Sequence, residues 1–139
     1  MMGRSQRAKG ARGEREAAAF WKPVWPDCAR RTCGEESQED RGRDLKNTPG
    51  WCVQCKTTAR PNPLAALAEA ISAAHDGEIP LAHCRRVISG RPAGEPPTVT
   101  MLARDARLLI CVYDRFRAAF PRRVEELRRE CDAQPEKED

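Results

Sequence analysis

The sequence is poor in aromatic residues and lacks any long apolar run. Phe, Trp and Tyr together make up 5% of the 139 residues, so we expect a core of aliphatic side chains and alanine. No apolar segment approaches the roughly 20 residues that a transmembrane helix needs, and no apolar segment follows the basic N-terminal residues as it would in a secretory signal. These absences predict a cytoplasmic protein without membrane contact.

The excess of positive charge is small, but it is unevenly distributed. Lys and Arg number 25 against 21 Asp and Glu, a formal net charge of +4. Basic residues gather near the N-terminus, where Glu14 and Glu16 are the only acids among the first 16 residues: Arg4, Arg7, Lys9, Arg12 and Arg15. A basic arm of this kind suits phosphate backbones, and a merely solvated terminus explains it equally well.

Apolar periodicity and turn residues predict the order helix, three strands, helix, two strands, helix. This order is typical of an α/β (α+β) fold, a single domain with a mixed central β-sheet flanked by helices. We expect a disordered basic arm over residues 1–7, one domain over residues 8–131 and a disordered tail over residues 132–139. The expected helices cover residues 8–21, 63–76, 105–120 and 121–131, and the clearest strands cover residues 28–33, 51–55, 79–88 and 98–103.

Two of the expected helices carry apolar residues at helical spacing, which predicts the faces that they bury. In the helix that begins at Pro63, the apolar residues are Leu64, Leu67, Ala68 and Ile71. In the helix after Asp105, they are Leu108, Leu109, Val112, Phe116 and Phe120. The second face either covers the sheet of its own domain or forms part of a contact between two chains.

The strand that begins at Trp51 combines an apolar face with polar side chains. Side chains two residues apart share a face of a strand, so Gln54 and Lys56 point one way while Val53 and Cys55 point into the core. Asp44 precedes the strand by one turn, which places it beside Gln54. Oxygen ligands next to a fixed ammonium suit a hard divalent cation and phosphodiester hydrolysis. The pattern therefore predicts a magnesium site at the sheet edge.

Asp44 followed by Gln54-Cys55-Lys56 resembles the D-x(n)-(E/Q)-x-K signature of the PD-(D/E)xK nuclease superfamily. Upstream, Lys9-Gly10-Ala11-Arg12-Gly13-Glu14-Arg15 is similar to the K-G-x-x-x-E-R opening of archaeal and phage-type Holliday-junction resolvases. The similarity covers roughly residues 8–116 and implies a restriction-endonuclease-like fold.

The resemblance implies roles for four residues and a class of substrate. Glu14, Asp44 and Gln54 would be the catalytic metal ligands, for Mg²⁺ with Mn²⁺ as a substitute, and Lys56 would act on the attacking water. The chain would then be a homodimeric endonuclease that cuts branched DNA. Gln54 stands where a glutamate is commoner, so the site carries one negative charge less and should hold its metal more loosely.

The expected contacts with DNA come from basic side chains. We name Arg7, Lys9, Arg12, Arg30 and Arg31 as the DNA-binding candidates, with Arg30 and Arg31 expected on the surface. Between these arginines and Asp44 lies an acidic loop, residues 34–43, which either covers the site or supplies another acid.

Three other interpretations stay open. A related nuclease could act on flaps or ends. Glu14 and Lys56 could serve only in ion pairs or as a solvated strand end. The third interpretation is a zinc ribbon without catalysis, because Cys28, Cys33, Cys52 and Cys55 are four potential ligands. Against zinc, two cysteines three residues apart on one strand face opposite sides.

Overall fold

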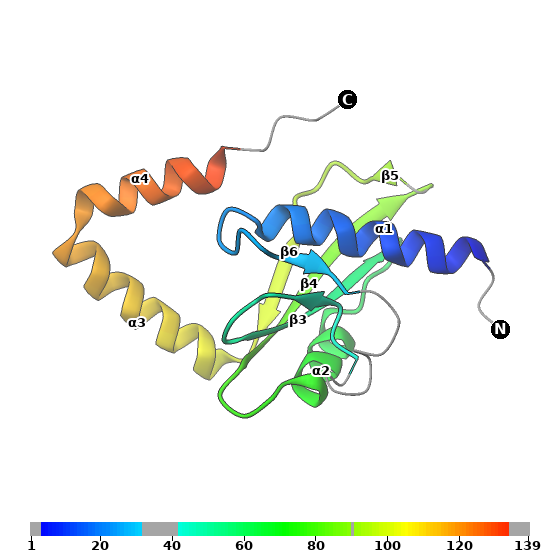
Figure 1. Cartoon of the computed structure of the whole chain (residues 1–139), viewed down its shortest axis with the longest axis horizontal. Helices are drawn as coiled ribbons and strands as arrows, with labels where there is room; N and C mark the ends of the chain where they lie inside the picture. The colour runs from blue at the N-terminus through cyan, green and yellow to red at the C-terminus, as the bar shows by residue number, and fades with distance from the viewer. Residues whose placement is uncertain (1–3, 32–41, 90, 134–139) are drawn as a thin grey trace. The chain divides into compact units, whose positions relative to one another are not determined.

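The computed structural model describes residues 4–31, 42–89 and 91–133. The chain divides into two compact units, Met1–Leu102 and Ala103–Asp139, so the domain expected over residues 8–131 extends into both. The first unit contains α1 (Arg4–Trp21), β1 (Ala29–Arg30), β2 (Leu45–Lys46), β3 (Trp51–Thr58), α2 (Pro63–Ala73), β4 (Ile79–Ile88), β5 (Arg91–Pro92) and β6 (Thr98–Met101) (Figure 1). The second contains α3 (Ala103–Ala119) and α4 (Pro121–Asp132).

Strand β4 is the centre of a mixed sheet. Strand β3 pairs with it in parallel, in a register that runs from Trp51↔Ile79 to Thr58↔Arg86. Strands β5 and β6 both pair with β4 antiparallel. Strands β1 and β2 form a separate antiparallel pair. The predicted α/β (α+β) class with a mixed sheet and flanking helices is therefore confirmed.

Each face of strands β3 and β4 packs against one helix. Under α1, the buried cluster contains Ala17, Ala18, Cys28, Leu45, Val53 and Leu81. Under α2, it contains Ala66, Leu67, Ala82 and Cys84. Burying a Val or Leu side chain stabilises the fold by about 1.5–3 kcal/mol. Because helices cover both faces, the consecutive residues Cys52, Val53 and Gln54 of β3 are all buried, as is typical of parallel strands.

Helix α2 begins where the sequence predicts but buries a different face. The Asn62 side chain accepts a hydrogen bond from the Ala65 N–H and Pro63 is the first helical residue, so the start is confirmed. The predicted apolar face is wrong for Leu64, Ala68 and Ile71, which are all exposed, Leu64 at 73% and Ile71 at 46%. The helix instead buries Ala66, Leu67, Ala70 and Ala73, since small side chains let it approach the sheet closely.

Helix α1 begins at Arg4, four residues before the expected start. Arg4–Arg7 are therefore helical instead of disordered, and residues 1–3 lie outside the described residues. Helix propensity accounts for the difference, because Arg and Gln are good helix formers and neither Gly nor Pro occurs between Arg4 and Ala8.

In the second unit, α3 buries none of its residues. The predicted apolar face is thus exposed, with Leu108 at 55% and Val112 at 56%. Helix α4 packs against α3 through few side chains: the Phe116 and Phe120 rings lie 5.1 Å apart at the junction, and Arg128 donates a hydrogen bond to the Tyr113 hydroxyl.

None of the helices in residues 4–31, 42–89 and 91–133 combines the length and apolar character that a membrane span requires.

Candidate functional site

Gln54 is buried in the middle of β3, with 4% of its surface exposed. Its side chain faces α2, because Val53 and Cys55 on either side of it pack in the cluster under α1. The Gln54 Nε2 donates a hydrogen bond of 3.2 Å to the Gly42 carbonyl. That bond satisfies one half of a buried amide and turns the amide oxygen away from Gly42.

Asp44 contacts β3 as predicted, at Cys55 instead of Gln54. Its Oδ2 accepts a hydrogen bond of 2.8 Å from the Cys55 backbone N–H. The pKa of Asp44 is raised from 3.8 to about 6, chiefly by burial. The Cys55 N–H and the Lys56 ammonium lower it, and the negative charges of Glu14 and Glu69 raise it, within that net value. The carboxyl group therefore titrates just below neutral pH, in the range where a carboxylate can also serve as a base.

Glu14 comes from α1 and is held by an arginine. Its Oε2 accepts a hydrogen bond of 2.7 Å from the Arg30 Nε, and the two side chains are 23% and 25% exposed. The ion pair connects α1 to β1. Glu14 lies close enough to Asp44 for the negative charge of Glu14 to raise the pKa of Asp44.

The position of Glu14 depends on its neighbour Gly13. A Cβ atom at Gly13 would lie 2.5 Å from the Thr57 Oγ1 and 2.7 Å from the Thr57 Cβ, so only glycine lets α1 lie this close to β3. Gly10, the glycine in the K-G opening, has open space around it. The motif drew attention to Gly10, but Gly13 makes the close contact.

Lys56 reaches the same region from the end of β3. Its Nζ lies 2.7 Å from the Glu69 Oε2 of α2, and the two side chains are 35% and 50% exposed. Glu69 was not identified from the sequence, where it reads only as a polar residue on a helix. We define the charged cluster as Glu14, Arg30, Asp44, Lys56 and Glu69.

The proposed metal ligands supply oxygen atoms, as a hard cation requires. One oxygen of Glu14 and one of Asp44 are engaged by Arg30 and Cys55. The second oxygen of each carboxylate and the Gln54 amide oxygen are the atoms that the predicted metal would use; Gln54 faces α2, whereas Glu14 comes from α1 on the other face of the sheet. Within the described residues, no group of three or more His, Cys, Asp or Glu side chains could hold a metal ion. The proposed set contains only two such side chains, so it depends on the Gln54 amide.

The predicted DNA-binding residues differ in their exposure. Lys9 and Arg12 are exposed on α1, and the side chain of Arg7 lies outside the described residues. Arg30 is held by Glu14. The expectation of a surface position is wrong for Arg31, which is 6% exposed because it lies at the end of β1, where its N–H donates to the Asp44 carbonyl.

The cysteine geometry gives the zinc interpretation no support. Cys55 packs in the cluster under α1, whereas Cys52 lies an odd number of residues away on the same strand and faces the other side. Both thiols are shielded from water, and burial raises the pKa of each. Residues 32–41 lie outside the described residues. They include Cys33 and most of the acidic loop, which covers residues 34–43.

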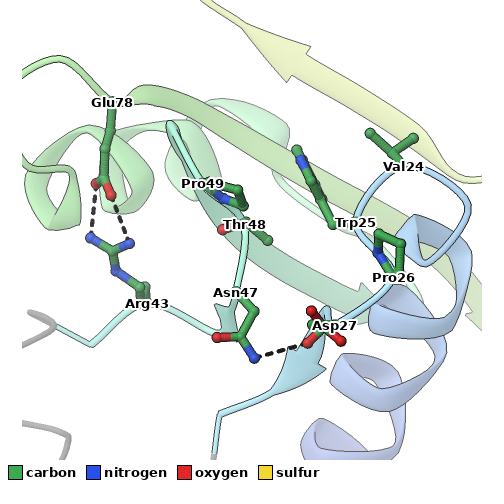
Figure 2. Close-up of a pocket in the computed structure, with 9 residues that line it drawn as sticks. All are labelled: Val24, Trp25, Pro26, Asp27, Arg43, Asn47, Thr48, Pro49 and Glu78. Carbon is green, nitrogen blue, oxygen red and sulfur yellow. Dashed lines mark hydrogen bonds and ion pairs between the residues drawn. The ribbon is translucent and has the colours of Figure 1, made fainter.

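One pocket formed by the described residues includes no member of the charged cluster. It has a volume of about 890 Å³ and is formed by Val24–Asp27, Arg43, Asn47–Pro49 and Glu78 (Figure 2). Arg43 binds both carboxylate oxygens of Glu78, at 2.9 and 2.8 Å, and the Asn47 side chain donates to the Asp27 carbonyl. These contacts hold the walls together and account for the polar lining without a ligand.

No protein-family model, curated protein or solved structure matches the chain. The chemistry of the charged cluster is therefore the basis for assigning a function.

Proposed function

We propose that this protein is a Mg²⁺-dependent, structure-selective DNA endonuclease that cuts branched DNA, with Mn²⁺ as a substitute for Mg²⁺ and the cytoplasm as its compartment. One observation carries the proposal: Asp44, which lies just before β2 and contacts β3 at Cys55, is acted on by the charges of Glu14 from α1 and Lys56 from β3. Strongly perturbed carboxyl groups beside a fixed cation are common at catalytic sites.

Each residue has a role in the proposed reaction. Glu14, Asp44 and the Gln54 amide oxygen hold the cation, and Lys56 orients the attacking water or stabilises the charge that develops on the phosphate. When bound, Mg²⁺ would polarise the scissile phosphate and make a water molecule more acidic. The neutral Gln54 leaves less negative charge at the site than a glutamate would, so we expect weak metal binding.

Exposed basic residues support contact with DNA. Lys9 and Arg12 lie on α1, the same helix that carries Glu14, and we include Arg7 with them. Such side chains contact phosphates and do not read bases. Selectivity would then come from the shape of the DNA.

The proposed homodimer is supported by the apolar face of α3. Leu108, Val112 and Phe120 are each more than half exposed, and Phe116 is 37% exposed. Monomeric proteins rarely expose an apolar patch of more than a few hundred Å². A symmetric homodimer would hold two charged clusters related by a two-fold axis, as paired incisions require.

The test is cleavage of linear duplex, flap and four-way junction DNA of matched sequence, with Mg²⁺, with Mn²⁺ and with EDTA. We expect paired incisions in the junction with either metal, no cutting in EDTA, and linear duplex spared. Cutting of flaps or ends alone would assign the related nuclease activity instead. Absence of cleavage on every substrate with both metals would reject the nuclease proposal.

A further inference from the structure

Lys56 does not stand alone at the end of β3, because Glu69 holds its ammonium. The Nζ–Oε2 distance is 2.7 Å, and both side chains remain partly exposed. An ion pair of this exposure contributes little to the stability of a fold. A lysine side chain also has many rotamers, so its partner decides where the ammonium points. A contribution to stability therefore does not by itself account for this ion pair.

The packing of α2 determines where the Glu69 carboxylate lies. Ala66 and Ala70 are fully buried against the sheet, and they precede and follow Glu69 on the same helix. Asn62 fixes the first turn of the helix through its cap. Rotating or sliding α2 would expose the alanine face, so Glu69 stays over the end of β3.

The charge of Glu69 also acts on the proposed site. Its charge is one of those that raise the pKa of Asp44, which places it near Asp44 as well as Lys56. The charged cluster then holds three carboxyl groups against two cations. Without Glu69 the cluster would hold two carboxyl groups and two cations. The Lys56 ammonium would also lose its ion pair with α2.

We propose that Glu69 is a positioning residue that holds the Lys56 ammonium beside Asp44, in the orientation needed for attack on the phosphate. This inference rests on the proposed nuclease function. Glu69 does not touch the reacting atoms in this role; it acts through Lys56.

The first test is a kinetic one on junction DNA. Glu69→Ala should lower kcat about tenfold, the size expected for one charge-assisted hydrogen bond, and should leave KM for DNA unchanged or lower. Glu69→Gln should recover part of the loss, since its amide oxygen still accepts from the ammonium. The matched control is Glu95→Ala, which breaks a similarly exposed pair with Arg86, at 3.2 Å, and makes the same change in charge.

The second test is a double-mutant cycle with Lys56. If Glu69 acts through Lys56, Glu69→Ala should have no further effect in the Lys56→Ala background. A wild-type rate for Glu69→Ala, or losses that add in the double variant, would overturn the inference.

A third measurement separates this inference from the proposed function. The NMR signal of the Lys56 side chain, assigned with Lys56→Arg, should shift in Glu69→Ala and stay unchanged in Glu95→Ala, with no DNA or metal present. An unchanged signal in Glu69→Ala would overturn the positioning role whatever the activity. A shifted signal in a protein that cuts no DNA would support the pair and reject the nuclease function.

Discussion

Two clusters pack around strands β3 and β4, one aromatic and one charged. The aromatic cluster consists of Trp21, Trp25, Trp51 and His83, with the Trp21 and Trp25 rings 5.1 Å apart and the Trp25 and Trp51 rings 5.8 Å apart. His83 is 3% exposed, and its Nδ1 accepts a hydrogen bond of 3.2 Å from the Trp21 Nε1. Each cluster buries one titratable group, His83 in the first and Asp44 in the second.

Burial opposes charge on both groups, but with different results at neutral pH. Burial and the charge of Arg85 lower the pKa of His83 to about 4, so the imidazole is neutral and suits its apolar surroundings. Burial raises the pKa of Asp44 to about 6, so at neutral pH the carboxyl group is charged despite the cost. At neutral pH the buried charge of Asp44 therefore lowers the stability of the charged cluster, whereas the neutral His83 avoids that cost in the aromatic cluster. Functional sites commonly carry such a cost.

The largest expected effect is on activity in the charged cluster. Lys56→Ala should lower the cleavage rate about 10²–10³-fold, because it removes a charge that stabilises the transition state. The fold should stay intact, since the lysine is 35% exposed and its ion pair is with a partly exposed carboxylate. Lys22→Ala, an exposed lysine on the turn after α1, is the control. Near wild-type cutting by Lys56→Ala would remove the charged cluster from the reaction.

The aromatic cluster should lose stability in acid. The pKa of His83 is lower in the folded chain than its ordinary value of 6.5, so stability is lost as the pH falls from 6.5 towards 4. The difference corresponds to about 3 kcal/mol. His83→Gln should abolish this part of the acid sensitivity in urea unfolding at several pH values, whereas His75→Gln, an exposed histidine, should keep it. Equal acid sensitivity in the two variants would contradict burial as the cause.

The charged cluster should show the opposite dependence on pH. The pKa of Asp44 is raised from 3.8 to about 6, so the folded chain loses stability as the pH rises between these values. Without divalent metal, Asp44→Asn should therefore be up to about 3 kcal/mol more stable than wild type at pH 8, and similar to it below pH 4. Asp76→Asn, at an exposed loop aspartate, should change neither.

The effect of Mg²⁺ on thermal stability tests whether Asp44 is a metal ligand. Added Mg²⁺ should raise the melting temperature of wild type and have a much smaller effect on Asp44→Asn, because the substitution replaces one of the two proposed anionic ligands, Asp44 and Glu14, with a neutral amide. An equal rise in both proteins would exclude Asp44 as a ligand.

The smallest expected effect separates two glycines of α1. Gly13→Ala should destabilise the fold by about 1–3 kcal/mol, since the added methyl group meets Thr57. Gly10→Ala should stabilise it by about 0.5–1 kcal/mol, since alanine is the better helix former and the space is open. Thermal unfolding of the two variants measures both. A stabilised Gly13→Ala would mean that α1 lies farther from β3 than described.

Local signals in the sequence determined much of the framework. The Asn62 cap and Pro63 set the start of α2, and the alternation along Trp51–Lys56 marked β3 and put Gln54 and Lys56 on one face. Asp44 could be placed next to β3 because only a short turn separates them. Each of these features depends on residues close in sequence, where backbone geometry alone decides what lies together.

Only the tertiary structure decided the contacts between distant elements. Glu69 lies 13 positions after Lys56 and meets it because α2 packs through alanine instead of the larger Leu64 and Ile71. Likewise, Thr57 leaves no room for a side chain at Gly13, whereas Gly10 has open space. Gln54 is buried because α1 and α2 cover the two faces of β3. The sequence contains all of these residues, but the helix positions that bring them together result from the packing of whole elements, which no local pattern records.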